Sequence, residues 1–304
     1  MTSKNFNKGN TNNWGGSWTN QKLDLFEKYV KAYITIMNKY GFWETIYFDG
    51  FAGSGEKGNV EKLELDLFSI EQNTVDDEEL TVYQGAAERI LKLEEPFKFN
   101  YYYFIEKDQN KAKMLKNKIK TIPNVDIDKC IIRADDSNQQ LVKLAEVLKE
   151  KRNRYAALIF LDPFGMQLNW KDIEKLKGTR SDIWILIPSG IIVNRLLDKS
   201  QKLRHIKKLE NFFGLKEEEI LNIFYPKNHQ SSLFEVEVES RSKVSNPINK
   251  ITEIYVENLN KIWDYVTQRP LILKNSKGIP IFHFVFASNN RNARKIASEI
   301  IDKK

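Results

Sequence analysis

Apolar strands and amphipathic helices alternate regularly over residues 97–188, and this alternation limits the possible folds more than any other feature of the chain. The expected strands are residues 101–106, 130–135, 155–161 and 181–187, and the expected helices between them are residues 109–121, 138–151 and 169–176. Strands that alternate with helices form βαβ units, in which the strands are parallel and the crossovers are right-handed. The pattern therefore predicts an α/β fold with a doubly wound, mostly parallel, Rossmann-like sheet.

Segments outside this region complete a sheet of about seven strands. A helix is expected over residues 19–41, because its apolar positions follow the 3.6-residue period and Thr19 can cap its start. A strand that ends at Asp49 follows it, and the first crossover helix is expected at residues 85–93. The expected C-terminal order is a helix at 251–263, a closing hairpin of strands 271–273 and 281–286, and a helix from Arg291.

Breaks in the pattern divide the chain into four parts. Residues 1–18 are polar and aperiodic and are predicted to be a flexible arm. Residues 19–188 are predicted to form the core, with an insertion at about residues 59–82 that has no clear period. Residues 189–250 are predicted to be an inserted helical lobe, a candidate for substrate or partner binding, with a basic helix at 196–209 and a strand-like stretch at 233–238. Residues 251–304 complete the core.

Composition excludes several classes of protein. The 304 residues are 41% hydrophobic and 29% charged, which is typical of a folded globular protein. No apolar run approaches the roughly 20 residues that cross a bilayer, so no membrane association is expected and the cytoplasm is the predicted compartment. Cys130 is the only cysteine and the three histidines are scattered, so no metal site is expected. The net charge of +7 suits a polyanionic partner.

The first strand runs into a glycine-rich turn, Asp49-Gly50-Phe51-Ala52-Gly53-Ser54-Gly55. Glycine accepts positive φ and has no Cβ, so such a turn lets the backbone approach a ligand closely. In open α/β sheets, ligands bind in the crevice outside the carboxyl ends of the strands. The turn is therefore predicted to be a nucleotide-cofactor loop.

Two cofactor classes fit this loop. Residues 53–58 match the G-x-G-x-x-G pattern of dinucleotide-binding proteins, but that motif also requires a helix at the glycines and an acidic residue about 20 positions on. The residues after the loop have no helical period, and the next acidic residue to end an apolar strand is Glu106. The loop resembles instead motif I, D-x-F-x-G-x-G, of class I methyltransferases that use S-adenosyl-L-methionine (AdoMet). NAD binding stays open as an alternative.

Acidic residues follow four of the expected strands, and they are Asp49, Glu106, Asp135 and Asp162. The carboxyl ends of parallel strands share one edge of the sheet, so these side chains are expected to line one cleft. The methyltransferase resemblance implies that Glu106 accepts the two ribose hydroxyls of AdoMet, which suits an acceptor-only, bidentate carboxylate. It implies that Asp135, or its rival Asp136, accepts the adenine amino group, and that Asp49 lies near the amino-acid portion. The same resemblance assigns to the cofactor site Gly50, Phe51, Ala52, Gly53 and Gly55.

A second motif, Asp162-Pro163-Phe164-Gly165, follows the fully apolar strand at residues 155–161. It resembles the [D/N/S]-P-P-[Y/F] motif of methyltransferases that act on exocyclic amino groups of nucleic-acid bases. The resemblance implies that Asp162 and the Pro163 carbonyl accept the N–H bonds of the target amine while Phe164 stacks on the flipped base. The second proline is missing and Phe164 lies one position early. The alternative is an Asp-Pro turn that only ends the strand.

The order and spacing of four segments, at residues 22–33, 47–55, 104–106 and 161–165, resemble the three-Cys-motif partner (TcmP) family of methyltransferase-like proteins. The resemblance implies an AdoMet-dependent methyltransferase that acts with a separate three-cysteine protein of iron–sulfur or radical-AdoMet type. DNA or RNA is the candidate substrate, and basic residues between positions 199 and 208 are candidates to contact its phosphates. A second interpretation is a non-catalytic scaffold that binds AdoMet or nucleic acid and serves the three-cysteine protein.

Overall fold

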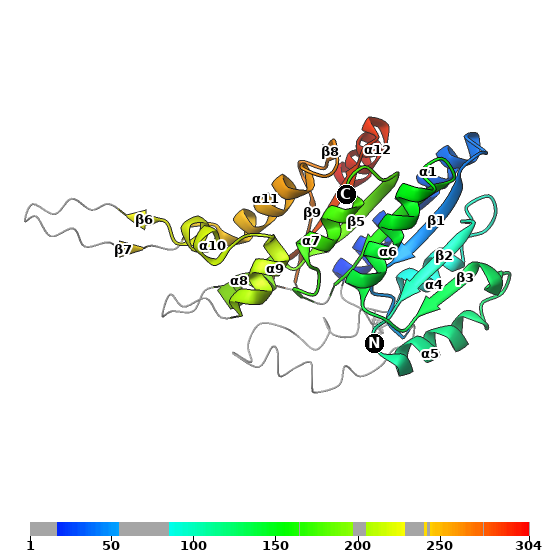
Figure 1. Ribbon diagram of the computed structural model, residues 1–304, viewed down its shortest axis with the longest axis horizontal. Helices are drawn as coiled ribbons and strands as arrows, with labels where there is room; N and C mark the ends of the chain where they lie inside the picture. Colours follow the sequence, from blue (N-terminus) through cyan, green and yellow to red (C-terminus); the bar gives the residue numbers. More distant parts are fainter. Residues whose placement is uncertain are drawn as a thin grey trace, which may run out of the picture.

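The computed structural model describes residues 17–54, 85–163, 165–196, 205–228, 240–241, 244–275 and 277–303. Within these residues, a central sheet is covered by helices on both faces (Figure 1). The predicted insertion at residues 59–82 and the strand-like stretch at 233–238 lie outside the described residues, as do two predicted site residues, Gly55 and Phe164.

Among the described residues the sheet has eight strands, one more than the seven or so expected, and five of them are parallel and adjacent in the order β3-β2-β1-β4-β5. These strands are β1 (Glu44–Asp49), β2 (Tyr101–Ile105), β3 (Cys130–Arg133), β4 (Tyr155–Leu161) and β5 (Ser181–Ile187). The antiparallel strand β10 (Pro280–Ser288) lies between β5 and two short strands, β8 (Tyr265–Val266) and β9 (Leu271–Lys274). A separate ribbon pairs β6 (Lys227–Asn228) with β7 (Ser240–Arg241). The predicted doubly wound, mostly parallel sheet with a closing hairpin is confirmed.

Helices cover the two faces of the sheet in two groups. The first face packs against α1 (Ser17–Lys39), α4 (Ala86–Leu91), α5 (Gln109–Ile119) and α12 (Arg291–Asp302). The second packs against α6 (Ser137–Glu150), α7 (Trp170–Ile173), α9 (Ile206–Phe213), α10 (Glu217–Phe224) and α11 (Pro247–Leu259). Helix α8 (Ser189–Leu196) packs against β10 and α11. Two 3₁₀ turns, η1 (Ile127–Lys129) and η2 (Glu174–Leu176), complete the described elements.

An aromatic cluster fixes α1 across the middle of the first face. The ring of Phe26 lies 4.4 Å from that of Phe160 on β4, and Trp184 of β5 lies 4.6 Å from Phe284 of β10. Alternate residues of a strand point to opposite faces, so the neighbours of these rings in the chain, such as Ile159, pack on the second face. The position of Phe26 matters for function, because it sets where the residue one turn earlier, Lys22, reaches the sheet.

Helix α1 begins at Ser17, two residues earlier than predicted, so Trp18 belongs to the helix rather than to an N-terminal arm. The Trp18 ring lies 5.1 Å from Phe282 and is buried, and this packing extends the helix beyond the expected capping residue. Thr19 is accordingly inside the first turn and not at the cap. Helix α11 also begins earlier than predicted, at Pro247, because the Asn246 side chain caps it and proline is favoured at the first helical position.

The region predicted as an inserted lobe differs from the prediction at its start. Residues 189–196 form α8. Of the predicted basic helix at 196–209, residues 197–204 lie outside the described part of the chain, and residues 206–209 belong to α9. Helices α8 and α9 contribute Ile192 and Phe212 to the same core as the sheet residues. The described part of the predicted lobe therefore packs as a continuation of the core.

Candidate active site at the carboxyl edge of the sheet

The parallel strands bring the four predicted carboxylates to one edge of the sheet, here called the carboxyl edge. Asp49 ends β1, Glu106 and Asp162 directly follow β2 and β4, and Asp135 lies two positions beyond β3. No hydrogen bond or ion pair between described residues joins the side chains of Glu106 or Asp135 to those of Asp49 or Asp162. The edge thus contains three separate environments.

The first environment is a buried ion pair between Lys22 of α1 and Asp162. The Lys22 Nζ lies 2.5 Å from Asp162 Oδ2, and the two residues are 1% and 6% exposed. The ammonium also lies 5.6 Å from the centre of the Trp18 ring and 6.0 Å from that of Phe160, within the range of cation–π attraction. The other Asp162 oxygen, Oδ1, is buried and has no hydrogen-bond partner among the described residues. It is an acceptor whose partner would have to come from a ligand or from a residue outside the described set.

Asp49 lies beneath the glycine-rich turn and is 1% exposed. Its Oδ1 accepts the Phe51 N–H at 3.1 Å, and its Oδ2 accepts the Tyr47 hydroxyl at 3.4 Å. Burial raises the pKa of Asp49 to about 7, and the neighbouring Asp162 also raises it, although the Phe51 N–H and the Tyr47 hydroxyl oppose the shift. Asp49 therefore supports the turn from below, and the structure places no free Asp49 oxygen in an open cavity.

Backbone hydrogen bonds attach the turn to both neighbouring strands. The Gly50 N–H donates to the Phe160 carbonyl at 3.0 Å, and the Ala52 N–H donates to the Ile105 carbonyl at 2.9 Å. Gly53 has a φ of 66°, the left-handed region that glycine adopts without strain. A Cβ at Gly50 would lie 2.6 Å from Leu161 Cδ2 and 2.7 Å from the Ser137 Oγ, so close packing alone requires glycine there.

The second environment is the half-buried Glu106, next to the turn. Its carboxylate accepts the Asp108 N–H at 2.9 Å and the N–H of Gly53. Burial raises the pKa of Glu106, and the two backbone N–H groups oppose the shift. A carboxylate has about four acceptor positions, so two remain for hydroxyl groups of a ligand.

The third environment is the start of α6, where Asp135 and Asp136 are held. Asp135 accepts the Asp136 N–H at 2.8 Å and the Gln140 Nε2 at 2.6 Å, and the Asp136 N–H lowers the pKa of Asp135. Asp136 caps α6 by accepting the N–H groups of Asn138 and Gln139. Both carboxylates thus have local structural roles. The adenine contact expected of Asp135 or Asp136 stays a prediction.

The chain after Asp162 is fixed by local hydrogen bonds. The Pro163 carbonyl, expected to accept from a target amine, accepts the Gly165 N–H at 3.0 Å. Gly165 has a φ of 89°, which favours glycine. The buried side chain of Asn138 then donates to the Gln167 carbonyl at 2.9 Å and accepts the Asn169 N–H at 2.8 Å.

Two of these residues, Lys22 and Asn138, were missed in the sequence analysis. Lys22 had a detectable signal, since it is four residues from both Trp18 and Phe26 and so occupies the apolar stripe of α1. A lysine in such a stripe needs a buried partner. Asn138 follows an N-capping residue and has no comparable signal.

Neither a metal cluster nor a membrane span is found in the described residues. No group of three or more His, Cys, Asp or Glu side chains there could hold a metal ion. Among the described helices, none combines the length and apolar character that crossing a bilayer requires.

Comparison with known proteins finds similarity in solved structures. No protein-family model matches the sequence, and no curated protein is significantly similar to it. A Legionella pneumophila protein described as DUF519 aligns with a TM-score of 0.44 and 10% identity, over 92% of this chain and 90% of that one. Trm1 from Pyrococcus horikoshii, in complex with AdoMet, aligns with a TM-score of 0.37 and 11% identity, over 92% of this chain and 57% of that one. Because both TM-scores are below 0.5, neither structure assigns a role to a residue of this chain.

The order of the strands agrees with the fold expected from the motifs. Five parallel strands are followed in space by an antiparallel strand, β10, and then by the β8 and β9 segments that run parallel to β5. The glycine-rich turn and the acidic residue of the next strand meet at the carboxyl edge. The chain therefore has a doubly wound, mostly parallel α/β fold whose strand order is of the methyltransferase-like type.

Proposed function

We propose that the protein is an AdoMet-dependent methyltransferase that acts on an exocyclic amino group of a nucleic-acid base. The observation that carries this proposal is the state of the Asp162 carboxylate, which has Oδ2 fixed by Lys22 and Oδ1 buried without a described partner. Leaving a buried acceptor unsatisfied costs about 1–3 kcal/mol, so such a group calls for an explanation. An amino group of a substrate would satisfy it.

Other residues at the carboxyl edge fit AdoMet. Glu106 keeps acceptor positions for two ribose hydroxyls, and the turn at Gly53, anchored to the Glu106 carboxylate, brings backbone close to that position. Asp49 would hold the turn in place rather than contact the cofactor. When bound, AdoMet supplies an electrophilic methyl group on a sulfonium ion.

Asp162 would orient the acceptor for transfer. Its Oδ1 would accept one N–H bond of the target amine, which fixes the direction of the nitrogen lone pair. A bound AdoMet would supply the methyl group to this nitrogen and leave as S-adenosylhomocysteine, and the N–H hydrogen held by Asp162 Oδ1 would be the proton that the nitrogen loses. Lys22 compensates the charge of Asp162 and holds its position. Alignment of this kind supplies a large share of the rate in such reactions.

A polar groove lies beside the carboxyl edge. Its volume is about 780 Å³, and it lies between α6, α7 and α9. Three lysines line it, Lys143, Lys171 and Lys208, and so do three acidic residues, Asp136, Glu146 and Asp172, so the lining carries no net charge. The net charge of +7 of the whole chain, rather than this groove, favours a polyanionic substrate. Stacking by Phe164 belongs to this proposal as a sequence-based expectation.

A second candidate function is the scaffold interpretation, in which the chain binds AdoMet or nucleic acid and presents it to a three-cysteine protein. The observation that favours it is the Pro163 carbonyl, which already accepts the Gly165 N–H, so only one of its two lone pairs is left for an amine. The TcmP resemblance supplies the partner. Copurification of the two proteins without methyl incorporation would support this candidate over the first.

Methyl incorporation from labelled AdoMet into RNA and DNA tests the leading proposal. We expect the wild-type chain to label one of the two substrates, and the Asp162→Ala variant to lose labelling while AdoMet binding persists. Asp128→Ala, which removes an exposed carboxylate of η1, is the matched control and should keep wild-type labelling. Wild-type labelling by a folded Asp162→Ala variant would rule out the proposed role of this carboxylate.

A further inference from the structure

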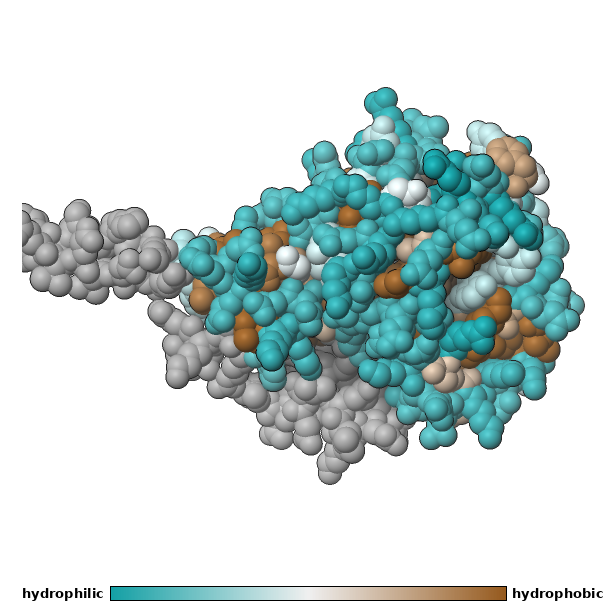
Figure 2. All heavy atoms as spheres, viewed as in Figure 1, coloured by the Kyte–Doolittle hydropathy of each residue, from teal (hydrophilic) through white to brown (hydrophobic). Residues whose placement is uncertain are grey.

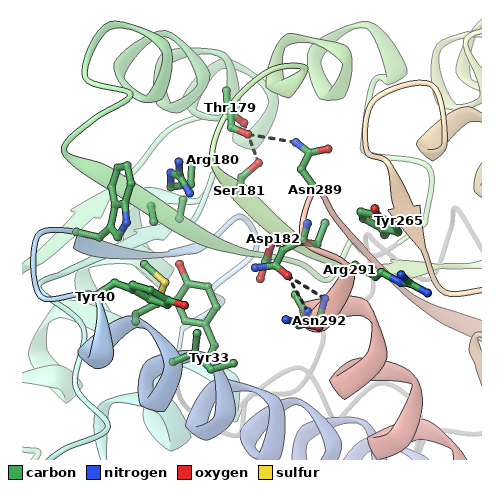
Figure 3. Close-up of a pocket in the computed structure, with 18 of the residues that line it drawn as sticks. Tyr33, Tyr40, Thr179, Arg180, Ser181, Asp182, Tyr265, Asn289, Arg291 and Asn292 are labelled. Atoms are coloured by element: carbon green, nitrogen blue, oxygen red, sulfur yellow. Dashed lines mark hydrogen bonds between the residues drawn. The ribbon is translucent and has the colours of Figure 1, made fainter.

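A second cavity lies at the opposite, amino edge of the parallel strands, with a volume of about 880 Å³ (Figure 3). It is formed by the end of α1, the start of β5 and the start of α12. Strand β5 has seven residues and so spans roughly 23 Å, which separates this cavity from the carboxyl edge. The proposed methyl-transfer site therefore does not explain it.

The charge of the cavity lining favours an anion. Among the lining residues, four are basic, and they are Lys39, Arg152, Arg180 and Arg291, whereas one, Asp182, is acidic. No ion pair with a described residue is formed by any of the four. Helix α12 begins at Arg291, beside the cavity, and its positive end adds to the field.

Aromatic rings at one end of the cavity favour a planar ligand. Phe42 is 65% exposed and Tyr40 is 53% exposed, both in the connection between α1 and β1. Trp43 is covered by the Arg180 guanidinium, whose carbon lies 3.8 Å from the ring centre. The face seen in Figure 2 is mostly hydrophilic, with hydrophobic areas in several places, one of them at the corner where α1 leads into β1. Exposed rings beside arginines form a stacking surface for a base.

The floor of the cavity holds a buried donor that has no described partner. The Tyr33 hydroxyl is buried, with the residue 7% exposed, and forms no hydrogen bond with a described residue. Burial raises the pKa of Tyr33, the Asp182 carboxylate raises it further and the Arg180 guanidinium opposes the shift, so the hydroxyl stays protonated between these two charges. Asp182 itself accepts the hydroxyls of Tyr29 at 2.7 Å and Ser288 at 2.5 Å. The same cavity is thus lined by a hydroxyl donor at Tyr33 and a carboxylate acceptor at Asp182, a combination that suits the polar edge of a ligand.

We propose that this cavity binds a nucleoside phosphate, either as a free nucleotide or as one unit of a single-stranded nucleic acid. The base would stack on Phe42 and Tyr40, and the phosphate would contact Arg180 and Arg291 near the start of α12. The Tyr33 hydroxyl would donate to the polar edge of the ligand. This site is independent of methyl transfer, so it stands or falls separately from the proposed function.

Titrations of the full chain with AMP and with a fluorescent ten-residue oligoadenylate, both in excess AdoMet, test the proposal. We expect saturable binding of at least one probe. Binding of AMP identifies a free nucleotide as the ligand, and binding of the oligoadenylate alone identifies a unit of a strand. Tyr33→Phe should weaken binding about 3- to 10-fold, because one hydrogen bond to the ligand is lost. Phe42→Ala should weaken binding at least about fivefold, because stacking on the base is lost.

The Tyr33→Phe variant separates binding from folding. The hydroxyl has no described partner, so its removal should leave the melting temperature of the free protein unchanged or raised. The same change should lower the affinity for the ligand. Lys113→Ala, on the exposed side of α5, should leave binding unchanged. Absence of saturable binding by both probes, or binding that neither Tyr33→Phe nor Phe42→Ala weakens, would overturn the proposal.

Discussion

Lys22 and Asp162 lie 140 positions apart in the chain, yet their side chains form a buried ion pair with Nζ 2.5 Å from Oδ2. The pair joins the first helix of the core to the end of its central strand β4. It also divides the Asp162 carboxylate into one oxygen that is held and one that has no described partner. Packing of Phe26 against Phe160 positions Lys22 for this contact, so the geometry of the site depends on the placement of α1.

Removal of one partner should destabilise the fold strongly. We predict that Lys22→Met lowers the free energy of unfolding by about 3–5 kcal/mol, because Asp162 then keeps an uncompensated buried charge. The double variant Lys22→Met/Asp162→Leu should recover much of the loss. Urea denaturation measures the free energy of unfolding of the single and the double variant. The matched control is Lys31→Met, which breaks a partly exposed pair with Glu27 and should change the free energy by about 0.5 kcal/mol or less. A similarly small effect of Lys22→Met would contradict the burial of this pair.

Asp49 should make stability fall as pH rises. Burial raises its pKa from an ordinary 3.8 to about 7 in the folded protein, so between these values the unfolded chain has released a proton that the folded chain keeps. The free energy of unfolding therefore decreases from pH 4 to pH 7, by up to about 4 kcal/mol from this group. We predict that Asp49→Asn gains stability relative to wild type across this window, whereas the exposed Asp126→Asn does not. Thermal melts at half-unit pH steps measure the difference, and a pH-independent difference for Asp49→Asn would refute the shift.

Gly190 should be intolerant of a side chain. A Cβ there would lie 2.4 Å from the Pro280 carbonyl oxygen and 2.9 Å from Ile281 Cα, both of them backbone atoms of β10. We predict that Gly190→Ala costs about 1–3 kcal/mol of stability, despite the better helix propensity of alanine. Gly41→Ala, where no atom lies within 4 Å of the added Cβ, should be close to neutral. Equal melting temperatures for the two variants would show that α8 does not contact β10 as closely as described.

The parts of the fold that the sequence predicted well are those with strong local signals. Strands β4 and β5 have the predicted bounds, because each is a buried apolar run between turn residues. Helix α12 begins at the predicted Arg291, where the Asn290 side chain caps it. Helix α8 was missed because Ile191-Ile192-Val193 favours a strand locally, and only packing against β10 decides for a helix.

The candidate site was predictable in position but less so in detail. Strand ends place Glu106 and Asp162 at the carboxyl edge, as topology requires. The burial of Asp49 depends on how the turn folds back over it, and the Lys22 contact depends on a helix from a distant part of the chain. Neither relationship is a property of sequence spacing, so neither could be obtained without three-dimensional packing.

Calorimetric titration with AdoMet of the wild type and of Glu106→Ala tests the central claim most directly. NAD serves as the competing ligand, and Glu94→Ala, an exposed carboxylate, serves as the matched variant. We predict that the wild type binds AdoMet saturably and does not bind NAD. Glu106→Ala should weaken AdoMet binding at least about tenfold, because hydrogen bonds to a charged group contribute about 1.5–3 kcal/mol each. Glu94→Ala should leave AdoMet binding unchanged. Absence of AdoMet binding, or AdoMet binding that Glu106→Ala does not weaken, would contradict the assignment of this edge as an AdoMet site.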